Sequence, residues 1–186
     1  ALPHDLTNAL AAAALVLETG LATPADVATA LATFQAPRHR LEPIGEAGGV
    51  RWYNDSKATT PHAASTAIRA FESLVLIAGG SRKGVDLAPM GQWPERMRAV
   101  VAIGQAGPDI EAVFADTEPA VPVVTADSMT DAVAAAAALA RPGDAVVLSP
   151  GCASFDWYAN YLARGDDFRN LVTAHLAERA RQEATS

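Results

Sequence analysis

The chain contains only two lysines, Lys57 and Lys83, and both stand where a lysine can bind an anionic small molecule. Each follows a run of apolar and aromatic residues that predicts a strand, at residues 50–53 and 73–78. Because the sequence has 14 basic residues, the other 12 are arginines, so the lysines are not needed for general surface charge. A lysine ammonium is a compact, mobile point charge. In loops after strands, two of them can neutralise a phosphate or a carboxylate.

A third loop of interest follows the predicted strand at residues 144–148. The strand is expected to stop at Ser149-Pro150-Gly151, because proline has no N–H for a sheet ladder and glycine accepts unusual dihedral angles. Small and hydroxyl residues follow, among them Ser154, then an aromatic cluster that includes Tyr161, and then a helix that carries Arg164. Open α/β sheets place ligands where a strand ends in such a loop. A turn that only packs its aromatic side chains is the alternative.

The residue pattern gives little support to cysteine chemistry, metal binding or a phosphate-binding P-loop. Cys152 has no histidine or acid obviously placed to activate its thiol, so we expect a small packed residue. A hydrolase or redox enzyme built on Cys152 is kept as an alternative. The four histidines lack the spacing of metal ligands, so no metal site is expected in this chain. No stretch of the sequence fits the order G-x-x-x-x-G-K-[ST].

Alternating strand and helix patterns along residues 37–186 predict a doubly wound α/β fold with a mostly parallel, Rossmann-like sheet. Residues 41–53 are expected to form an antiparallel hairpin at one edge, with a turn at residues 45–49. Further strands are expected at residues 99–103 and 121–124, and helices at residues 128–140 and 166–181. The loops after residues 53, 78 and 148 all leave carboxyl ends of strands. They should therefore converge on one rim of the sheet.

Residues 1–36 form a separate predicted region of two helices, at residues 8–18 and 24–34. Thr23-Pro24-Ala25-Asp26 supplies an N-cap, a proline at the first helical position and an acid in the first turn. Two such helices cannot close a hydrophobic core of their own. Gln35-Ala36-Pro37 is the expected link to the second domain, residues 37–186.

Composition limits the classes of function that fit. A formal charge of −7 disfavours a nucleic-acid surface, because a phosphate backbone needs a basic face. No apolar run approaches 18 residues, so no membrane span is expected, and we see no secretory signal. A single cysteine cannot form an internal disulfide, which suits a reducing cytoplasm. We expect a monomer in the cytoplasm.

Several stretches resemble signatures of the Mur ligase family, specifically of its members that add D-glutamate. LSPGCASFDWYANYLARGDDF at residues 148–168 resembles their C-terminal signature, and NDSKATTPHA at residues 54–63 resembles NDSKATN. GGSRKGVD at residues 79–86 resembles GGxxKxxD, and HRLE at residues 39–42 resembles HRFE. HDLTNALA at residues 4–11 resembles H-N-x-x-N-x-x-A more weakly. The departures are Asp5 and Thr60 where the family has asparagine, and Tyr161 where it usually has phenylalanine.

The resemblance implies a pocket for the amino-acid substrate. Lys83 and Thr59 would take the α-carboxylate of glutamate, while Ser154 and the backbone near Tyr161 would take its side-chain carboxylate. The extra hydroxyl of Tyr161 would alter or add a contact. A solvated lysine at Lys83 and a helix-capping role for Thr59 are the alternatives.

The resemblance also implies residues that lie near the nucleotide or neutralise negative charge. Lys57 would neutralise phosphate or carboxylate charge, Arg40 would reach the ATP phosphates from the linker, and Arg164 would add a cation to the anion pocket. Asp55 and Asn8 would lie near the nucleotide. Three alternatives remain open. Asp55 could only cap the chain locally, Arg40 could be a solvated arginine in the hinge, and Asn8 could be an ordinary asparagine in the first turn of a helix.

The reaction implied by the resemblance is ATP-dependent amide formation in peptidoglycan precursor synthesis. ATP would phosphorylate the carboxylate of UDP-N-acetylmuramoyl-L-alanine, and the amine of D-glutamate would attack the acyl phosphate, releasing ADP and phosphate. Residues 1–36 would be the helical tail of a central ATP-binding domain. ATP and Mg²⁺ would be held mainly by domains absent from this chain, so the isolated chain is expected to fold without ligating.

Two further alternatives remain at this point. The chain could be a stand-alone nucleotide- or anion-binding regulatory module, which needs no other domain. It could also belong to a family member that adds L-glutamate or another amino acid, because the sequence does not set the stereochemistry of the substrate.

Overall fold

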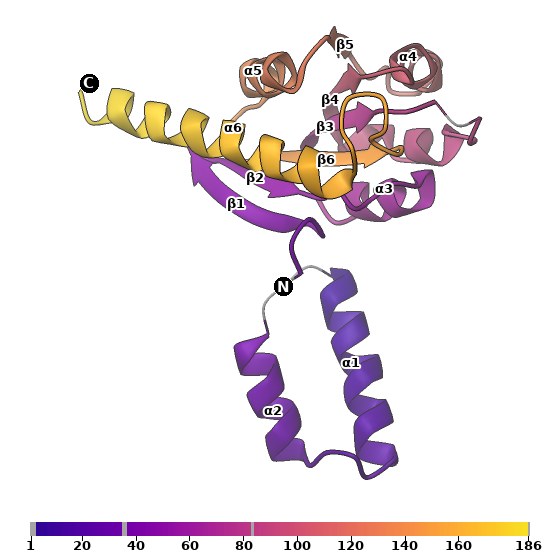
Figure 1. Ribbon diagram of the computed structural model, residues 1–186, viewed down its shortest axis with the longest axis vertical. Coiled ribbons are helices and arrows are strands. Elements are labelled where there is room, and N and C mark those ends of the chain that lie inside the picture. The colour runs from indigo at the N-terminus through magenta and orange to yellow at the C-terminus, as the bar shows by residue number, and fades with distance from the viewer. Residues whose placement is uncertain (1–2, 35–36, 83, 186) are drawn as a thin grey trace. The chain divides into compact units, whose positions relative to one another are not determined.

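The computed structural model describes residues 3–34, 37–82 and 84–185 (Figure 1). The chain divides into two compact units, Ala1–Pro37 and Arg38–Ser186. The division lies one residue after the boundary expected from the sequence.

The first unit contains the helices α1 (Pro3–Glu18) and α2 (Pro24–Thr33). Helix α2 begins as the sequence predicts, because the Thr23 hydroxyl accepts a hydrogen bond from the Asp26 N–H and the Asp26 carboxylate accepts one from the Thr23 N–H. Helix α1 starts at Pro3, five residues earlier than predicted, since proline fits the first turn of a helix, where no N–H is needed. None of the residues of α2 is buried, in keeping with a pair of helices too small to build a core.

The second unit is a six-stranded sheet in the order β1-β2-β6-β3-β4-β5. Its strands are β1 (Glu42–Ala47), β2 (Val50–Asn54), β3 (Leu74–Gly79), β4 (Met97–Ile103), β5 (Val123–Ala126) and β6 (Ala145–Gly151). All neighbouring strands are parallel except β1 and β2, which form an antiparallel hairpin at one edge. The prediction of a doubly wound, mostly parallel α/β sheet is confirmed.

Helices cover the sheet and enclose its core (Figure 1). They are α3 (Pro61–Ile68), α4 (Gly107–Ala115), α5 (Met129–Leu139) and α6 (Tyr161–Glu183), with short 3₁₀ segments at Ala88–Gln92 and Pro94–Arg96. Strands β3 and β6 are buried along their whole length, which is why both read as continuous apolar runs in the sequence. Trp52 and Phe168 join the central strands to α6 within the core.

Several predicted boundaries in the second unit are wrong, and β5, for example, runs from Val123 to Ala126 instead of residues 121–124. Strand β6 does not stop after Leu148 but continues to Gly151, and the pairing of β6 with β3 shifts register where it passes Pro150. The hairpin turn is only Gly48-Gly49, with φ of 57° and 73°, because two left-handed residues match the twist of the flanking strands. Helix α6 begins at Tyr161 instead of residue 166, since the Asn160 side chain accepts from the Ala163 N–H and caps the first turn.

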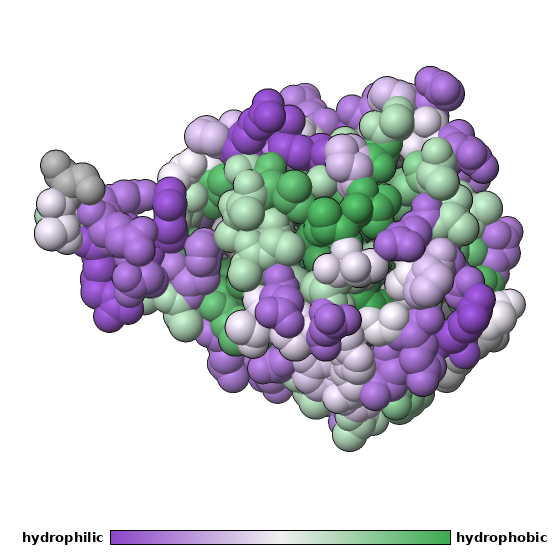
Figure 2. Space-filling model, turned by 90° about the horizontal axis from the view of Figure 1, so that it is seen from above, coloured by the Kyte–Doolittle hydropathy of each residue, from purple (hydrophilic) through white to green (hydrophobic). Residues whose placement is uncertain are grey.

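Hydrophobic side chains gather in the middle of the face shown in Figure 2, whereas the projecting C-terminal end of α6 is hydrophilic. Within residues 3–34, 37–82 and 84–185, no helix is both long enough and apolar enough to cross a bilayer.

Candidate functional site

The loops that leave β2, β3, β4 and β6 are joined to one another at one edge of the sheet. The Ala58 carbonyl after β2 accepts from the Gly151 N–H at 2.9 Å, and the Ser81 N–H after β3 donates to the Ala153 carbonyl at 2.8 Å. The Gln105 N–H after β4 donates to Asp156 Oδ2 at 3.0 Å. The prediction that the loops after residues 53, 78 and 148 converge on one rim is therefore confirmed.

The loop after β3 lies so close to the loop after β6 that a glycine is required at the contact. Gly80 has a φ of 138°, and a Cβ placed on it would lie 2.4 Å from the Ala153 carbonyl oxygen. A side chain at this position would push the backbones apart. Gly80 thus fixes the start of the segment that leads to Lys83.

Arg164 is buried beneath this rim, with 1% of its surface exposed. Its Nε donates to the Ser56 hydroxyl at 3.0 Å and its Nη2 to the Ser56 carbonyl at 2.9 Å. Both Nη1 and Nη2 donate to the Cys152 carbonyl at 3.1 Å. Burial lowers the pKa of Arg164 to about 10, which leaves the guanidinium charged at neutral pH. Every nitrogen of the guanidinium donates to the protein itself, and the predicted place of Arg164 in the anion pocket stays a prediction.

Asp55 is also directed inward. It is 8% exposed, and its carboxylate accepts from the Ser149 hydroxyl at 2.7 Å and from the Leu41 N–H at 3.1 Å. Burial raises the pKa of Asp55 to about 6, although these hydrogen bonds and the charge of Arg40 oppose the rise. In this conformation Asp55 ties residues 39–41 to β6, and its predicted role at the nucleotide stays a prediction.

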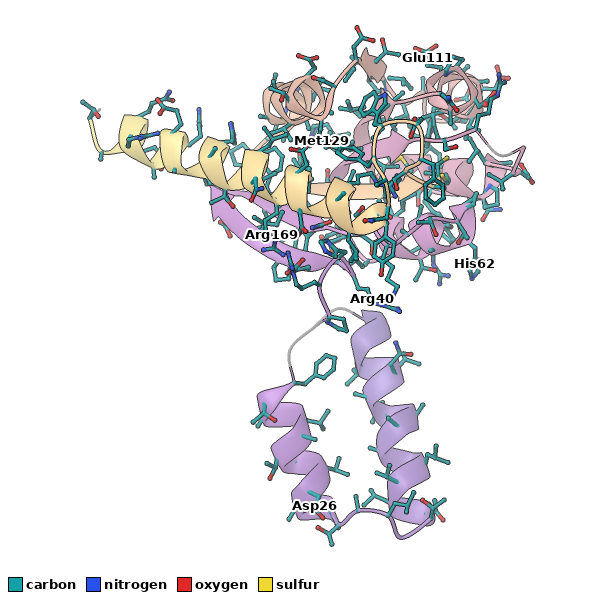
Figure 3. The ribbon with its side chains drawn as sticks, in the orientation of Figure 1. Asp26, Arg40, His62, Glu111, Met129 and Arg169 are labelled. Atoms are coloured by element: carbon teal, nitrogen blue, oxygen red, sulfur yellow. The ribbon has the colours of Figure 1, made fainter. Side chains whose placement is uncertain are left out.

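Lys57 and Arg40 are exposed cations among the described residues of the second unit. The Lys57 Nζ lies 5.5 Å from the centre of the Tyr161 ring, a separation at which an ammonium and an aromatic face attract. Arg40 projects from the linker side of the second unit (Figure 3). Both cations are thus available to an anion.

The residues predicted to bind glutamate come from the joined loops, with one outside the described part of the chain. Thr59 and Tyr161 are half-buried, and Ser154 is 2% exposed. The backbone carbonyl of Tyr161 accepts from the Ser56 hydroxyl at 2.8 Å, so α6 and the loop after β2 are held together at this point. Lys83 lies outside the described residues.

Asn8 is exposed on α1 in the first unit. Its predicted role at the nucleotide stays a prediction.

Cys152 has the properties of a packing residue. It is 2% exposed, burial raises the pKa of its thiol to about 11, and its carbonyl oxygen is held by Arg164. A thiol with this pKa is protonated at neutral pH and is a poor nucleophile. These observations oppose the hydrolase and redox alternatives.

No group of three or more histidine, cysteine, aspartate or glutamate side chains within the described residues could hold a metal ion.

Two hollows of similar size lie in the second unit. The first, of about 300 Å³, is lined by Asp127, Ser128, Met129, Thr130, Trp157, Tyr158 and Asp167. The second, of about 320 Å³, lies between the β1–β2 hairpin, α5 and α6, and Trp52 and His175 are among its walls. Neither is lined by Thr59, Ser154 or Tyr161.

Sequence reasoning missed several polar residues that build the rim. Ser56 joins Arg164 to the Tyr161 carbonyl, and Asp156 joins the loops after β4 and β6. His39 and Asn54, both buried, hold the linker against α6. All four stand inside the motif stretches, so their polar character there was the available signal.

The chain matches one known protein family over most of the second unit. Residues 39–152 match the family described as Mur ligase, glutamate ligase domain. This range contains three of the four joined loops.

Bacterial relatives cover nearly all of the chain. The UDP-N-acetylmuramoylalanine–D-glutamate ligase of Frankia casuarinae is 46% identical over 173 residues, which is 92% of this chain and 36% of the relative. The enzyme of the same name from Nitrosococcus oceani is 47% identical over 178 residues, 94% of this chain and 38% of the relative. The chain therefore spans less than two fifths of the length of either relative.

Two solved structures share the fold at low sequence identity. The UDP-N-acetylmuramate-alanine ligase of Thermotoga maritima has a TM-score of 0.67 at 14% identity, over 94% of this chain and 39% of that one. The MurF ligase of the same organism, solved with ADP, has a TM-score of 0.63 at 16% identity, over 96% of this chain and 40% of that one. With the match over residues 39–152, these findings show that the chain belongs to the Mur ligase family and contains its glutamate ligase domain.

Proposed function

We propose that the chain is the glutamate-binding end of an ATP-dependent ligase that joins D-glutamate to UDP-N-acetylmuramoyl-L-alanine. The relatives that carry this name are 46% and 47% identical over more than nine tenths of the chain. The observation that carries the proposal is the junction of the three motif loops at one rim. There the loop with Thr59 binds the end of β6, and the loop that leads to Lys83 binds the residue next to Ser154.

The chemistry of a dicarboxylic amino acid fits this rim. Each carboxylate of glutamate needs a cation or a set of donors. Lys83 and Thr59 would receive the α-carboxylate, and Ser154 with the backbone at Tyr161 would receive the side-chain carboxylate. Arg164 supports the pocket from beneath by fixing Ser56 and the carbonyl of Cys152.

In the proposed reaction the amine of D-glutamate attacks an acyl phosphate formed from ATP and the carboxylate of UDP-N-acetylmuramoyl-L-alanine. The C–N bond forms, the C–O bond to phosphate breaks, and ADP and phosphate leave. Positioning and charge stabilisation dominate such chemistry. This chain would supply the amine in a fixed orientation and two cations, Lys57 and Arg40, near the phosphates. ATP and Mg²⁺ would be held mainly by the remainder of the full-length protein.

We also propose that the first unit is the helical tail of the central, ATP-binding domain. The exposed leucines of this unit and the exposed Phe34 support the assignment. Among the described residues, α1 and α2 form no core of their own that could bury these side chains. The expected monomeric state and bacterial cytoplasmic location remain predictions.

Titration of the ¹⁵N-labelled chain with D-glutamate, L-glutamate and ADP in separate NMR experiments tests the pocket. D-glutamate should shift amide signals in residues 56–60 and 152–161 in a saturable way, and Lys83→Ala and Thr59→Val should each abolish the shifts. Arg181→Ala, at an exposed position near the end of α6, is the matched control and should change nothing. Shifts confined to residues 127–130, or no saturable effect of D-glutamate, would contradict the assignment. Saturable ADP binding alone would favour the regulatory module.

A further inference from the structure

The linker at the start of the second unit contains two residues in a backbone conformation that side chains disfavour. His39 has a φ of 62° and Leu41 a φ of 44°. A left-handed conformation costs free energy for residues other than glycine, so it persists only where surrounding contacts hold it. Arg40 stands between these two residues and is exposed.

His39 is the residue that the surrounding contacts hold most tightly. It is 1% exposed, and its Nδ1 lies 3.0 Å from the Asn54 side-chain nitrogen. That nitrogen also donates to the Gly165 carbonyl at 3.0 Å, while the Asn54 oxygen accepts from the Ser56 N–H at 3.1 Å. The amide nitrogen is thus the donor and Nδ1 the acceptor. Burial lowers the pKa of His39, which agrees with a neutral ring that keeps its proton on Nε2.

Gly165 provides the space for this ring in the first turns of α6. A Cβ built on Gly165 would lie 2.2 Å from His39 Nδ1, which is closer than any real contact of a side chain. The ring therefore sits against bare helix backbone.

The backbone on both sides of Arg40 is bound to the second unit as well. The His39 N–H donates to Glu42 Oε2 at 3.0 Å, and the His39 carbonyl accepts from the Lys57 N–H at 3.1 Å. The Leu41 N–H donates to Asp55 Oδ1 at 3.1 Å. Glu42 itself is paired with Arg169 of α6, whose side chain lies between α6 and the hairpin in Figure 3.

We infer that His39 is a positioning residue whose ring, seated against Gly165, locks residues 39–41 onto the second unit and so fixes the direction of Arg40. The pivot between the units then lies before His39, and Arg40 moves as part of the second unit. The consequence for catalysis rests on the proposed function, in which Arg40 meets an anionic group of the nucleotide. The lock itself does not depend on that function.

The first test uses the 186-residue chain alone and measures whether His39 and Gly165 act as one contact. Hydrogen exchange of the amides of Lys57 and Leu41 is measured for His39→Ala, Gly165→Ala and the double variant. Each single change should speed exchange at both amides at least tenfold. Gly165→Ala should have little further effect once His39 is alanine, because the clash is gone. If the two substitutions speed hydrogen exchange independently, so that their effects multiply in the double variant, the lock is overturned.

His39→Asn is the second variant, because asparagine tolerates a left-handed backbone and keeps a polar side chain. Exchange should be as fast as in His39→Ala, because asparagine lacks the ring that sits against Gly165. Slow exchange in His39→Asn would show that backbone tolerance and polarity hold residues 39–41 without the ring, and would overturn the lock.

The second test uses the full-length ligase that contains this chain. His39→Ala should raise the KM for ATP about tenfold and leave the KM for D-glutamate within twofold. The variant His39→Ala with Arg40→Ala should be no worse than Arg40→Ala alone, since His39 acts through Arg40. Multiplicative losses, or equal rises of both KM values, would contradict the positioning role. If Arg40→Ala itself leaves the KM for ATP unchanged, the proposed role of Arg40 fails, while the exchange experiment still decides the lock.

Discussion

The guanidinium of Arg164 in α6 and the carbonyl oxygen of Cys152 at the end of β6 are joined by two hydrogen bonds of 3.1 Å. A charged group is thus used to hold two loops of the rim in place, and only 1% of Arg164 is exposed. Arg40, by contrast, is exposed at the same edge. Two arginines that stand in similar motif stretches therefore have different physical roles.

Arg164→Ala should destabilise the second unit by about 3 kcal/mol or more, because it leaves the buried carbonyls of Ser56 and Cys152 without donors. Urea unfolding of the 186-residue chain measures this loss. Arg40→Ala is the matched control and should change the free energy of unfolding by less than about 0.5 kcal/mol, as an exposed surface substitution. Equal effects of the two substitutions would contradict the assignment of Arg164 as a buried support.

Gly80→Ala should disrupt the contact between the loops after β3 and β6. A methyl group at Gly80 meets the Ala153 carbonyl oxygen at 2.4 Å, whereas one at Gly84 meets no atom within 4 Å. Both glycines have a positive φ, but the φ of 138° at Gly80 lies outside the left-handed region that Gly84 occupies with a φ of 64°, so the backbone cost is also larger at Gly80. Gly80→Ala should cost at least about 2 kcal/mol beyond Gly84→Ala. The comparison of thermal unfolding for the two variants checks this, and similar losses would show that the close approach is absent in solution.

Asp55 should make the chain less stable as the pH rises. Its folded-state pKa of about 6 lies above the ordinary value of 3.8, so the folded protein binds the proton more tightly than the unfolded chain. The contribution of Asp55 to the free energy of unfolding is fully present below about pH 4 and is lost as the pH rises to about 6. A shift of about 2 pKa units corresponds to about 3 kcal/mol.

Asp55→Asn should remove this dependence and raise the free energy of unfolding at pH 7, since an amide can accept from the Leu41 N–H and donate to the Ser149 hydroxyl. Urea unfolding between pH 4 and pH 7 measures the difference between the variant and the unchanged chain. Asp116→Asn, at an exposed carboxylate, is the control. If the free energy of unfolding of Asp55→Asn changes with pH in the same way as that of the unchanged chain, the buried, proton-binding state of Asp55 is contradicted.

Cys152 should resist alkylation. With 2% exposure and a pKa of about 11, its thiol should react with iodoacetamide at pH 7.5 at least a hundredfold more slowly than in the urea-unfolded chain. Mass spectrometry of the labelled protein gives both rates. Fast labelling of the folded chain would revive the hydrolase and redox alternatives.

Much of the architecture could be predicted from local patterns. Apolar runs located β3 and the centre of β6, and Thr23-Pro24 located the start of α2, because these signals depend only on neighbouring residues. The meeting of the loops followed from the parallel strands. The continuation of β6 past Pro150 could not be predicted, since it depends on how β3 shifts its pairing beside it.

The roles of the charged residues were harder to predict. A buried arginine and an exposed one look alike in a sequence, and only the carbonyls that converge on Arg164 distinguish it from Arg40. Asp55 likewise faces Ser149 and Leu41 because of the linker path, which two left-handed residues determine. Such contacts join segments far apart in the chain, and no local pattern encodes them.

The most direct test of the proposed function is phosphate release by the full-length protein that contains this chain, with ATP, Mg²⁺ and UDP-N-acetylmuramoyl-L-alanine. Release should depend on added D-glutamate and be at least a hundredfold slower with L-glutamate, and Lys83→Ala should raise the KM for D-glutamate at least tenfold. Equal rates with L-glutamate, or a Lys83→Ala variant with an unchanged KM for D-glutamate, would contradict the glutamate pocket proposed here.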